Sequence, residues 1–187
     1  MTQRQEQRGF SLLELLVVAA VVACLCAVAA PVYAGQRSKA ENVLLTANAR
    51  NLTTSVQSGW LEVQNAAPTS LPGGIIVARQ WLTQQVRDTS QTGAGLHIVN
   101  PCTGSGRVVN SDKLSHGLQS PAVWITSAPA YDHEEFVASN VTAVRLRGTI
   151  IVVYVVDSQQ RSGQIEIFSV DRNGDKSTVV QTVSLAD

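Results

Sequence analysis

Charged and aromatic residues are scarce in this sequence. Only 15% of its 187 residues are Asp, Glu, Lys or Arg, and fourteen basic residues balance fourteen acidic ones. The chain as a whole therefore lacks the positive charge that binding to duplex nucleic acid or to an anionic membrane surface requires, and no specific nucleic-acid partner is indicated. With three residues each of Trp, Tyr and Phe, an electron-carrying aromatic stack is poorly supported.

The cysteines are too few for a disulfide framework. Cys24 and Cys26 lie inside an apolar run, and Cys102 is the third. On a helix Cys24 and Cys26 would point about 200° away from each other, so they cannot bridge within one chain, and we expect them to act as small hydrophobes. The remainder of the chain has one thiol, so the cysteines do not fix a redox compartment.

Catalytic motifs are missing as well. The pairs Gly93–Gly95 and Gly104–Gly106 have neither a P-loop lysine nor a dinucleotide fingerprint around them, which favours flexible connections. The sequence contains no nucleophile elbow and no HExxH. We therefore predict that the protein is not an enzyme and needs no cofactor.

Two groups of residues are weak candidates for a metal site. Asp171, Asn173 and Asp175 mimic the first ligands of a calcium loop, but the glycine precedes Asp175 instead of following it, and Thr182 stands where the closing glutamate would be. The Asn-Gly pair in DRNGD favours a hairpin turn. The cluster DHEE at 132–135 favours a solvated loop, because adjacent residues rarely converge on one ion. We predict no metal.

The apolar run from Leu12 to Ala34 is the strongest feature of the sequence. Glu14 is its only charge, and as a helix its 23 residues are about 34 Å long, roughly the hydrocarbon thickness of a bilayer. The run can therefore span a membrane. Arg4 and Arg8 precede it, but basic residues also follow it, so the charge difference favours an inside N-terminus only weakly.

Three kinds of N-terminal segment fit this description. A secretory signal would be cut at a small-residue site such as Ala27–Ala29 or before Gly35, and it would give Glu14 no role. A plain membrane anchor would leave a carboxylate in hydrocarbon, at a cost on the order of a few kcal/mol. The third kind explains the glutamate, and it rests on one motif.

In that motif, Gly9 is followed by Phe10 and then by SLLELLVV, with Glu14 four residues after Phe10. The motif resembles the class III signal of type IV pilins and their relatives, the pseudopilins. The resemblance implies that a prepilin peptidase removes residues 1–9 as a leader by cutting between Gly9 and Phe10. It also implies that the new amino terminus of Phe10 is methylated.

Glu14 would then serve assembly. Cleavage places an α-amino group on Phe10 within one helical turn of Glu14, and in a stack of identical helices the carboxylate can pair with the amine of the next subunit. A buried ion pair adds little net stability, but leaving one partner unpaired costs about 3–5 kcal/mol, so the pair penalises wrong registers. Pro31, where many bacterial pilins carry a proline, is expected to loosen the helix during extraction from the bilayer, with a harmless kink as the alternative.

Beyond the apolar run the pattern becomes amphipathic. Spacings of three and four predict one buried helix face made of Leu45, Ala49, Leu52, Val56, Trp60 and Val63. We predict one helix from Phe10 to Gln64, bent near Pro31, with a membrane and filament-core part at 10–34 and an amphipathic part at 35–65. A variable connecting region at 66–121 would follow, with a break at PTSLPGG and a short helix within 75–88.

The last third of the chain reads as strands separated by turn residues. The β-branched runs are Ala122–Ser127, Val141–Arg147, Thr149–Asp157, Gln164–Val170 and Thr178–Leu185. We predict an α+β fold, with the long helix packed on an antiparallel sheet of four or five strands at 122–187, as in the ladle shape of pilins. The buried face of Gln164–Val170 stays ambiguous. In many pilins a disulfide bond fixes the C-terminal loop. Cys102 is the only cysteine outside the apolar run, so it has no partner for such a bond.

These expectations describe a structural subunit of a type IV pilus-like filament. It would be anchored in the cytoplasmic membrane with its N-terminus inside, then moved into an extracellular filament with other pilins. Its partners would be the prepilin peptidase, the assembly machinery and the lipid bilayer. A pseudopilin of a type II secretion-like system shares this N-terminal logic, and a Sec-secreted binding domain or enzyme would instead begin after Ala29 or Ala34. Adhesion, motility, DNA uptake and secretion are not distinguished.

Overall fold

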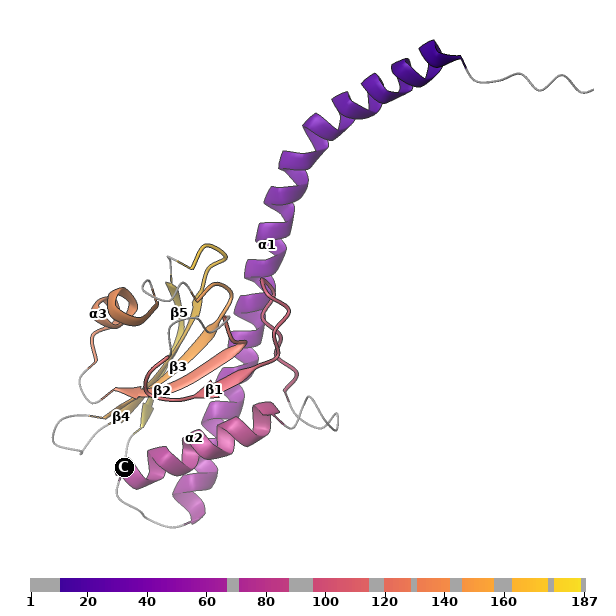
Figure 1. The fold of residues 1–187 in the computed structure, drawn as a ribbon. Coiled ribbons are helices and arrows are strands. Elements are labelled where there is room, and N and C mark those ends of the chain that lie inside the picture. Colours follow the sequence, from indigo (N-terminus) through magenta and orange to yellow (C-terminus); the bar gives the residue numbers. More distant parts are fainter. Residues whose placement is uncertain are drawn as a thin grey trace, which may run out of the picture. The chain divides into compact units, whose positions relative to one another are not determined.

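A computed structural model describes residues 11–66, 71–87, 96–114, 120–128, 131–141, 146–156, 163–174 and 177–185. The chain divides into two compact units, with the division between Lys39 and Ala40. The helix α1 (Leu12–Ala66) contributes to both units, and the second unit contains the remaining elements (Figure 1). Each unit is described by itself.

The long N-terminal helix is confirmed. It has 55 residues and continues through Pro31. In the second unit the predicted apolar stripe is the buried face of α1, made of Leu45, Ala49, Leu52, Val56 and Trp60. The side chain of Val63, like Phe10, lies outside the described residues. Residues spaced by three and four positions share one face of a helix, so this stripe packs on a common core.

The helix α2 (Leu71–Arg87) begins earlier than predicted. The expected break is wrong for Leu71–Gly74, because Pro72 lies in the first turn, where a helix does not need its missing backbone donor. Residues 67–70 lie outside the described residues. The apolar spacing in α2 is confirmed by the burial of Ile75, Ala78, Leu82 and Val86. Figure 1 shows α2 beside the C-terminal part of α1, where a Cβ at Gly59 would collide with the Trp81 ring.

Five strands form one sheet in chain order. They are β1 (Val108–Asn110), β2 (Val123–Ala128), β3 (Ile150–Val156), β4 (Gly163–Val170) and β5 (Ser177–Leu185). β1 and β2 pair in parallel, as do β2 and β3, whereas β3–β4 and β4–β5 are antiparallel. The α+β arrangement is confirmed, but the sheet is mixed, and the prediction of an antiparallel sheet is wrong for the first two pairings.

The lengths of the connections explain this mixture. Segments 111–122 and 129–149 separate the parallel strands, and each reaches the roughly dozen residues that a crossover needs. β4 and β5 pair as the predicted antiparallel hairpin, and Gly174 in the connection between them has φ 82°. The strand expected at 141–147 is wrong at its ends, since Val141 belongs to a π-helix, η2 (Val137–Val141), and Leu146 precedes a turn. Residues 142–145 lie outside the described residues, and β1 comes from the region expected to be a variable connection.

Both faces of the sheet are buried, which resolves the ambiguity of β4. Ile165 and Ile167 join the core formed with α1 and α2. Phe168 and Val170 join a second core on the opposite face, together with Trp124 and the segment that contains the short helix α3 (His133–Phe136). The ring of Phe136 stacks on Trp124 with centroids 5.7 Å apart.

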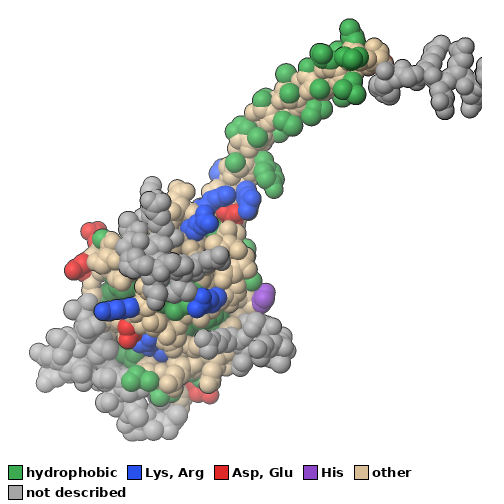
Figure 2. Space-filling model, viewed as in Figure 1, with side chains coloured by type: hydrophobic (Ala, Val, Ile, Leu, Met, Phe, Trp, Pro, Cys, Tyr) green, Lys and Arg blue, Asp and Glu red, His purple; other side chains and the backbone are tan. Residues whose placement is uncertain are grey.

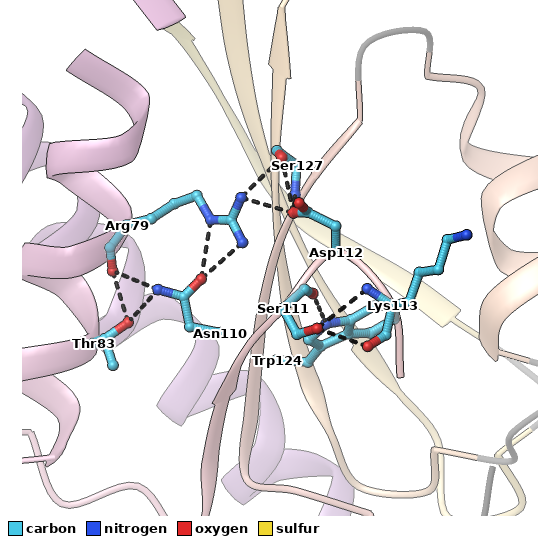
Figure 3. Close-up of polar contacts among 8 residues, drawn as sticks. All are labelled: Arg79, Thr83, Asn110, Ser111, Asp112, Lys113, Trp124 and Ser127. Carbon is cyan, nitrogen blue, oxygen red and sulfur yellow. Dashed lines mark hydrogen bonds and ion pairs between the residues drawn. The ribbon is translucent and has the colours of Figure 1, made fainter. Parts of the chain in front are cut away.

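Arg79 fixes α2 to the sheet (Figure 3). Its guanidinium donates to Asn110 Oδ1 at 2.7 Å, to Asp112 Oδ1 at 2.7 Å and to Ser127 Oγ at 2.8 Å. Asn110 Nδ2 in turn donates to Thr83 Oγ1 at 2.9 Å. Burial acts to raise the pKa of Asp112, but hydrogen bonds from Ser127 and Arg79 outweigh it, so this pKa is lowered. The network therefore joins α2, β1 and β2 through one cation.

Candidate functional site

The first turn of α1 is closed by two hydrogen bonds that involve Ser11. The backbone N–H of Ser11 donates to Glu14 Oε2 at 3.3 Å, and the N–H of Leu13 donates to Ser11 Oγ at 3.3 Å. The N–H of Leu15 donates to the Ser11 carbonyl at 3.3 Å, so Ser11 is the N-cap of the helix, whose first residue is Leu12. This arrangement is a variant of the capping box, in which a serine and a glutamate three residues later satisfy free donors of a helix start, with the serine hydroxyl accepting from Leu13 and not from Glu14.

The capping box gives Glu14 a role within its own chain. Its carboxylate is directed toward the N-terminus of α1, where the helix dipole favours negative charge. The sequence signal S-x-x-E before an apolar run was present in SLLE and would have predicted this contact. Gly9 and Phe10, the residues of the expected cleavage site, lie outside the described residues.

The apolar part of α1 exposes its large side chains. Leu12, Leu13, Leu15 and Leu16 are exposed, and exposed valines continue along the helix (Figure 2). Within the described ranges, α1 is the one helix long and apolar enough to cross a membrane. A continuous apolar surface on all sides is typical of a membrane span or of a helix covered by neighbouring helices. Glu14 is therefore a single exposed carboxylate near the start of a helix segment whose surface is otherwise apolar.

Glu41 begins the buried part of α1. Only 8% of it is exposed, and its Oε2 forms an ion pair with Nη1 of Arg172 at 3.1 Å. Arg172 lies in the turn between β4 and β5, so this ion pair joins the helix to the sheet. The thiol of Cys102 lies 3.9 Å from the same Oε2. Burial, followed by the charge of Glu41, raises the pKa of Cys102.

Asn100 organises the loops next to this ion pair. Its Nδ2 donates to the carbonyls of Pro121 and Arg147, both at 2.9 Å, and its Oδ1 accepts from the N–H of Cys102 at 2.9 Å. Gly148 has φ 70°, and a Cβ there would meet Asn100 Oδ1 and lie 2.9 Å from Cys102 Sγ. Sequence reasoning missed this cluster, because its members are far apart along the chain.

Two of the calcium candidates, Asp171 and Asn173, lie in the turn after β4. Asp171 Oδ1 accepts from the N–H of Gly174 at 2.9 Å, and Asn173 is exposed. Asp175 lies outside the described residues. In the part of the chain that the structure describes, no group of three or more His, Cys, Asp or Glu residues could hold a metal ion.

A buried carboxylate lies on the face of the sheet opposite α1. Glu166 on β4 accepts a hydrogen bond from the Tyr131 hydroxyl at 2.7 Å and contacts Nδ1 of His133. Burial and then the hydrogen bond to Glu166 raise the pKa of Tyr131. These contacts hold α3 on the sheet, where the sequence had favoured a solvated loop. Asp132 caps α3 through the N–H of Glu135 at 3.0 Å.

Comparison with known proteins identifies one segment. Residues 4–30 match the family described as the prokaryotic N-terminal methylation motif. No curated protein and no solved structure matches the chain. The matched residues contain the expected cleavage site, the capping box and most of the apolar run. Residues 4–30 therefore carry a prepilin-like signal similar to that of type IV pilins and pseudopilins.

Proposed function

We propose that the protein is a structural, non-catalytic subunit of a type IV pilus-like filament. The observation that carries the proposal is the methylation motif at residues 4–30, placed at the start of an exposed apolar helix. A prepilin peptidase cuts between Gly9 and Phe10 and methylates Phe10. The helix then anchors the subunit in the cytoplasmic membrane with its N-terminus inside, until the assembly machinery moves it into an extracellular filament.

Glu14 pairs with the amino terminus of a neighbouring subunit during assembly. Its hydrogen bond to the Ser11 N–H is 3.3 Å long, beyond the usual range for N–H donors, so it is readily exchanged. The amine of a neighbouring Phe10 offers a full positive charge instead. Because an unpaired buried charge costs about 3–5 kcal/mol, the exchange selects the register in which each carboxylate meets an amine.

The outer face of α1 supports packing between helices beyond the membrane. Val43 is 70% exposed and Leu44 is 49% exposed, whereas Leu45 next to them is only 4% exposed in the core. An apolar pair on the outer side of a helix is well suited to a neighbouring helix. We propose that α1 packs on other copies, or on other pilins, along this face. Pro31 loosens the helix where it leaves the bilayer.

Mass spectrometry of the protein extracted from membranes tests the processing step. A mature chain that begins with methylated Phe10 supports the proposal. A chain that begins after Ala29 or Ala34 would instead show a conventional secretory signal and would overturn it.

Electron microscopy of sheared surface material tests assembly. We expect filaments from the unchanged protein and few or none from Glu14→Gln, although that variant is still cut and inserted in the membrane. Glu62→Gln is the matched control, because Glu62 is an exposed glutamate on the same helix outside the apolar run. Normal filaments from Glu14→Gln would contradict the pairing. Filaments confined to a secretion machinery would indicate the pseudopilin form of the same function.

A further inference from the structure

The balanced net charge conceals a separation of charge within the second unit. Val108, Val123, Ile150, Ser169 and Thr178 form one row across the sheet. Exposed arginines lie just outside this row: Arg107 precedes it by one residue, and Arg147 precedes it by three. Arg172 follows it by three. We call this edge of the sheet the arginine end.

The arginine end keeps a positive balance after its carboxylates are counted. Arg147 and Arg172 both act on Cys102, as do Glu41 and Asp171. Arg172 pairs with Glu41 but keeps 41% of its side chain exposed. The exposed Arg107 and Arg147 add to it, and in the sequence Arg37 and Lys39 stand directly before Glu41.

The opposite end of the sheet carries the other sign. Ala128 ends β2 five residues after Val123, which corresponds to about 17 Å. Asp132, Glu134 and Glu135 follow and are exposed, and Figure 2 shows red side chains gathered where Figure 1 labels α3. An anionic surface would therefore attract the arginine end and repel the opposite end.

The chain tethers the arginine end close to such a surface. Glu41, which contacts Arg172, comes seven residues after Ala34, the last residue of the apolar run, so at most about 10 Å of helix separates them. Any bend shortens this distance. Headgroups extend roughly 5–8 Å beyond the hydrocarbon, and the Debye length at physiological salt is about 8 Å. The charge on Arg172, which contacts Glu41, is therefore only weakly screened from the lipid phosphates.

We infer that the arginine end binds anionic phospholipid headgroups of the membrane that holds α1, and so fixes how the subunit stands on the bilayer before assembly. The inference rests on the membrane anchoring in the proposed function. Each arginine near an anionic surface favours the bound state by about fivefold. The bound state is lost when the subunit leaves the bilayer.

Photo-crosslinking of the full-length protein in nanodiscs tests this inference. A photoreactive residue replaces Asn173, which is exposed at the arginine end, and in a matched sample it replaces Ser184, which is exposed at the opposite end. The discs contain either phosphatidylglycerol or phosphatidylcholine. We expect lipid adducts at 173 in anionic discs to exceed those at 184 severalfold. They should fall in phosphatidylcholine, and also in 0.5 M salt, where the Debye length is about half its value at physiological salt.

Charge variants decide whether the arginines are responsible. Arg147→Gln and Arg107→Gln should each lower the adduct yield at 173 by about fivefold, whereas Lys113→Gln, which changes an exposed lysine in the bend after β1, should not. Equal yields in the two lipids, or no effect of either arginine variant, would overturn the inference. Adducts to a second copy of the chain in place of lipid would assign the arginine end to a protein neighbour and overturn it too. Membrane recovery of the protein, measured in parallel, tests the anchoring separately.

Discussion

Glu41 and Arg172 are 131 positions apart in the chain, yet their ion pair of 3.1 Å joins the helix to the last hairpin of the sheet. The carboxylate is buried and the guanidinium is partly exposed. Replacing the cation by a neutral side chain therefore leaves a buried negative charge that has lost the Arg172 charge, whereas replacing both groups by neutral side chains also removes the buried charge.

We expect Arg172→Gln to lower the free energy of unfolding by about 1–3 kcal/mol, less than for a fully buried pair because Arg172 is partly exposed to solvent. Chemical denaturation of the protein in detergent measures this change. The double variant Glu41→Gln/Arg172→Gln should be more stable than Arg172→Gln alone. A double variant that is less stable than the single one would contradict the charge explanation.

The thiol of Cys102 should react slowly. Burial and the neighbouring Glu41 raise its pKa, so less thiolate is present at a given pH. In a Cys24→Ser/Cys26→Ser background, alkylation at pH 8 should be slower than for a free thiol. Glu41→Gln should speed it severalfold, because one of the causes that raise the pKa is removed, whereas Glu62→Gln should leave the rate unchanged. Circular dichroism confirms that the faster variant is folded, and equal rates would refute the effect of Glu41.

Gly148→Ala should destabilise the second unit. Its φ of 70° disfavours any side chain, and the added Cβ meets Asn100 and Cys102. We expect a loss of about 2–4 kcal/mol from backbone strain and steric overlap. Gly106→Ala is the control, since a Cβ there has open space, and it should change the free energy of unfolding by less than about 1 kcal/mol. A tolerated Gly148→Ala would show that the two loops move apart easily.

Ser11→Ala should loosen the start of α1. It removes the hydroxyl that accepts from the Leu13 N–H and costs the first turn about 1 kcal/mol. Hydrogen exchange in lipid nanodiscs should become faster at the amides of Leu13 and Leu15, with no change near Ala49. Ser11→Thr retains the acceptor and should retain the protection. Unchanged exchange in Ser11→Ala would mean that the capping box does not hold the first turn.

Local patterns predicted the elements that depend on local chemistry. The spacing of Leu45, Ala49 and Leu52 identified the buried face of α1, and the Asn-Gly pair identified the hairpin before β5. The direction of the strands was not predictable in the same way. β1 has only three residues, and a long connection between β1 and β2 allows the two strands to pair in parallel. The run that begins at Val141 reads as a strand by residue type, but Val141 itself ends the π-helix η2 and is buried in the same core as Trp124.

The residues of the candidate site likewise divide into those that local sequence identifies and those that only tertiary contacts bring together. Gly9, Phe10 and Glu14 form a contiguous motif and could be identified from the sequence, and Ser11 could have been identified with them. Glu41 and Arg172 could not, because nothing in either local sequence indicates the other. The burial of Glu166 on β4 could not be predicted from its local sequence, because its partners Tyr131 and His133 lie in the connection between β2 and β3.

The mixed sheet also sets an order of events for a newly made chain. β3, β4 and β5 pair with neighbours that are close in sequence, so these three strands can form quickly. β2 pairs with β3, so it cannot join them until β3 has been synthesised. The apolar stripe of α1 is made first, and although α2 follows it, the stripe must wait for the last quarter of the polypeptide before β3 and β4 complete its cover. During that interval the exposed apolar face of α1 needs protection from aggregation. A chaperone or the membrane surface would provide this protection for the nascent chain.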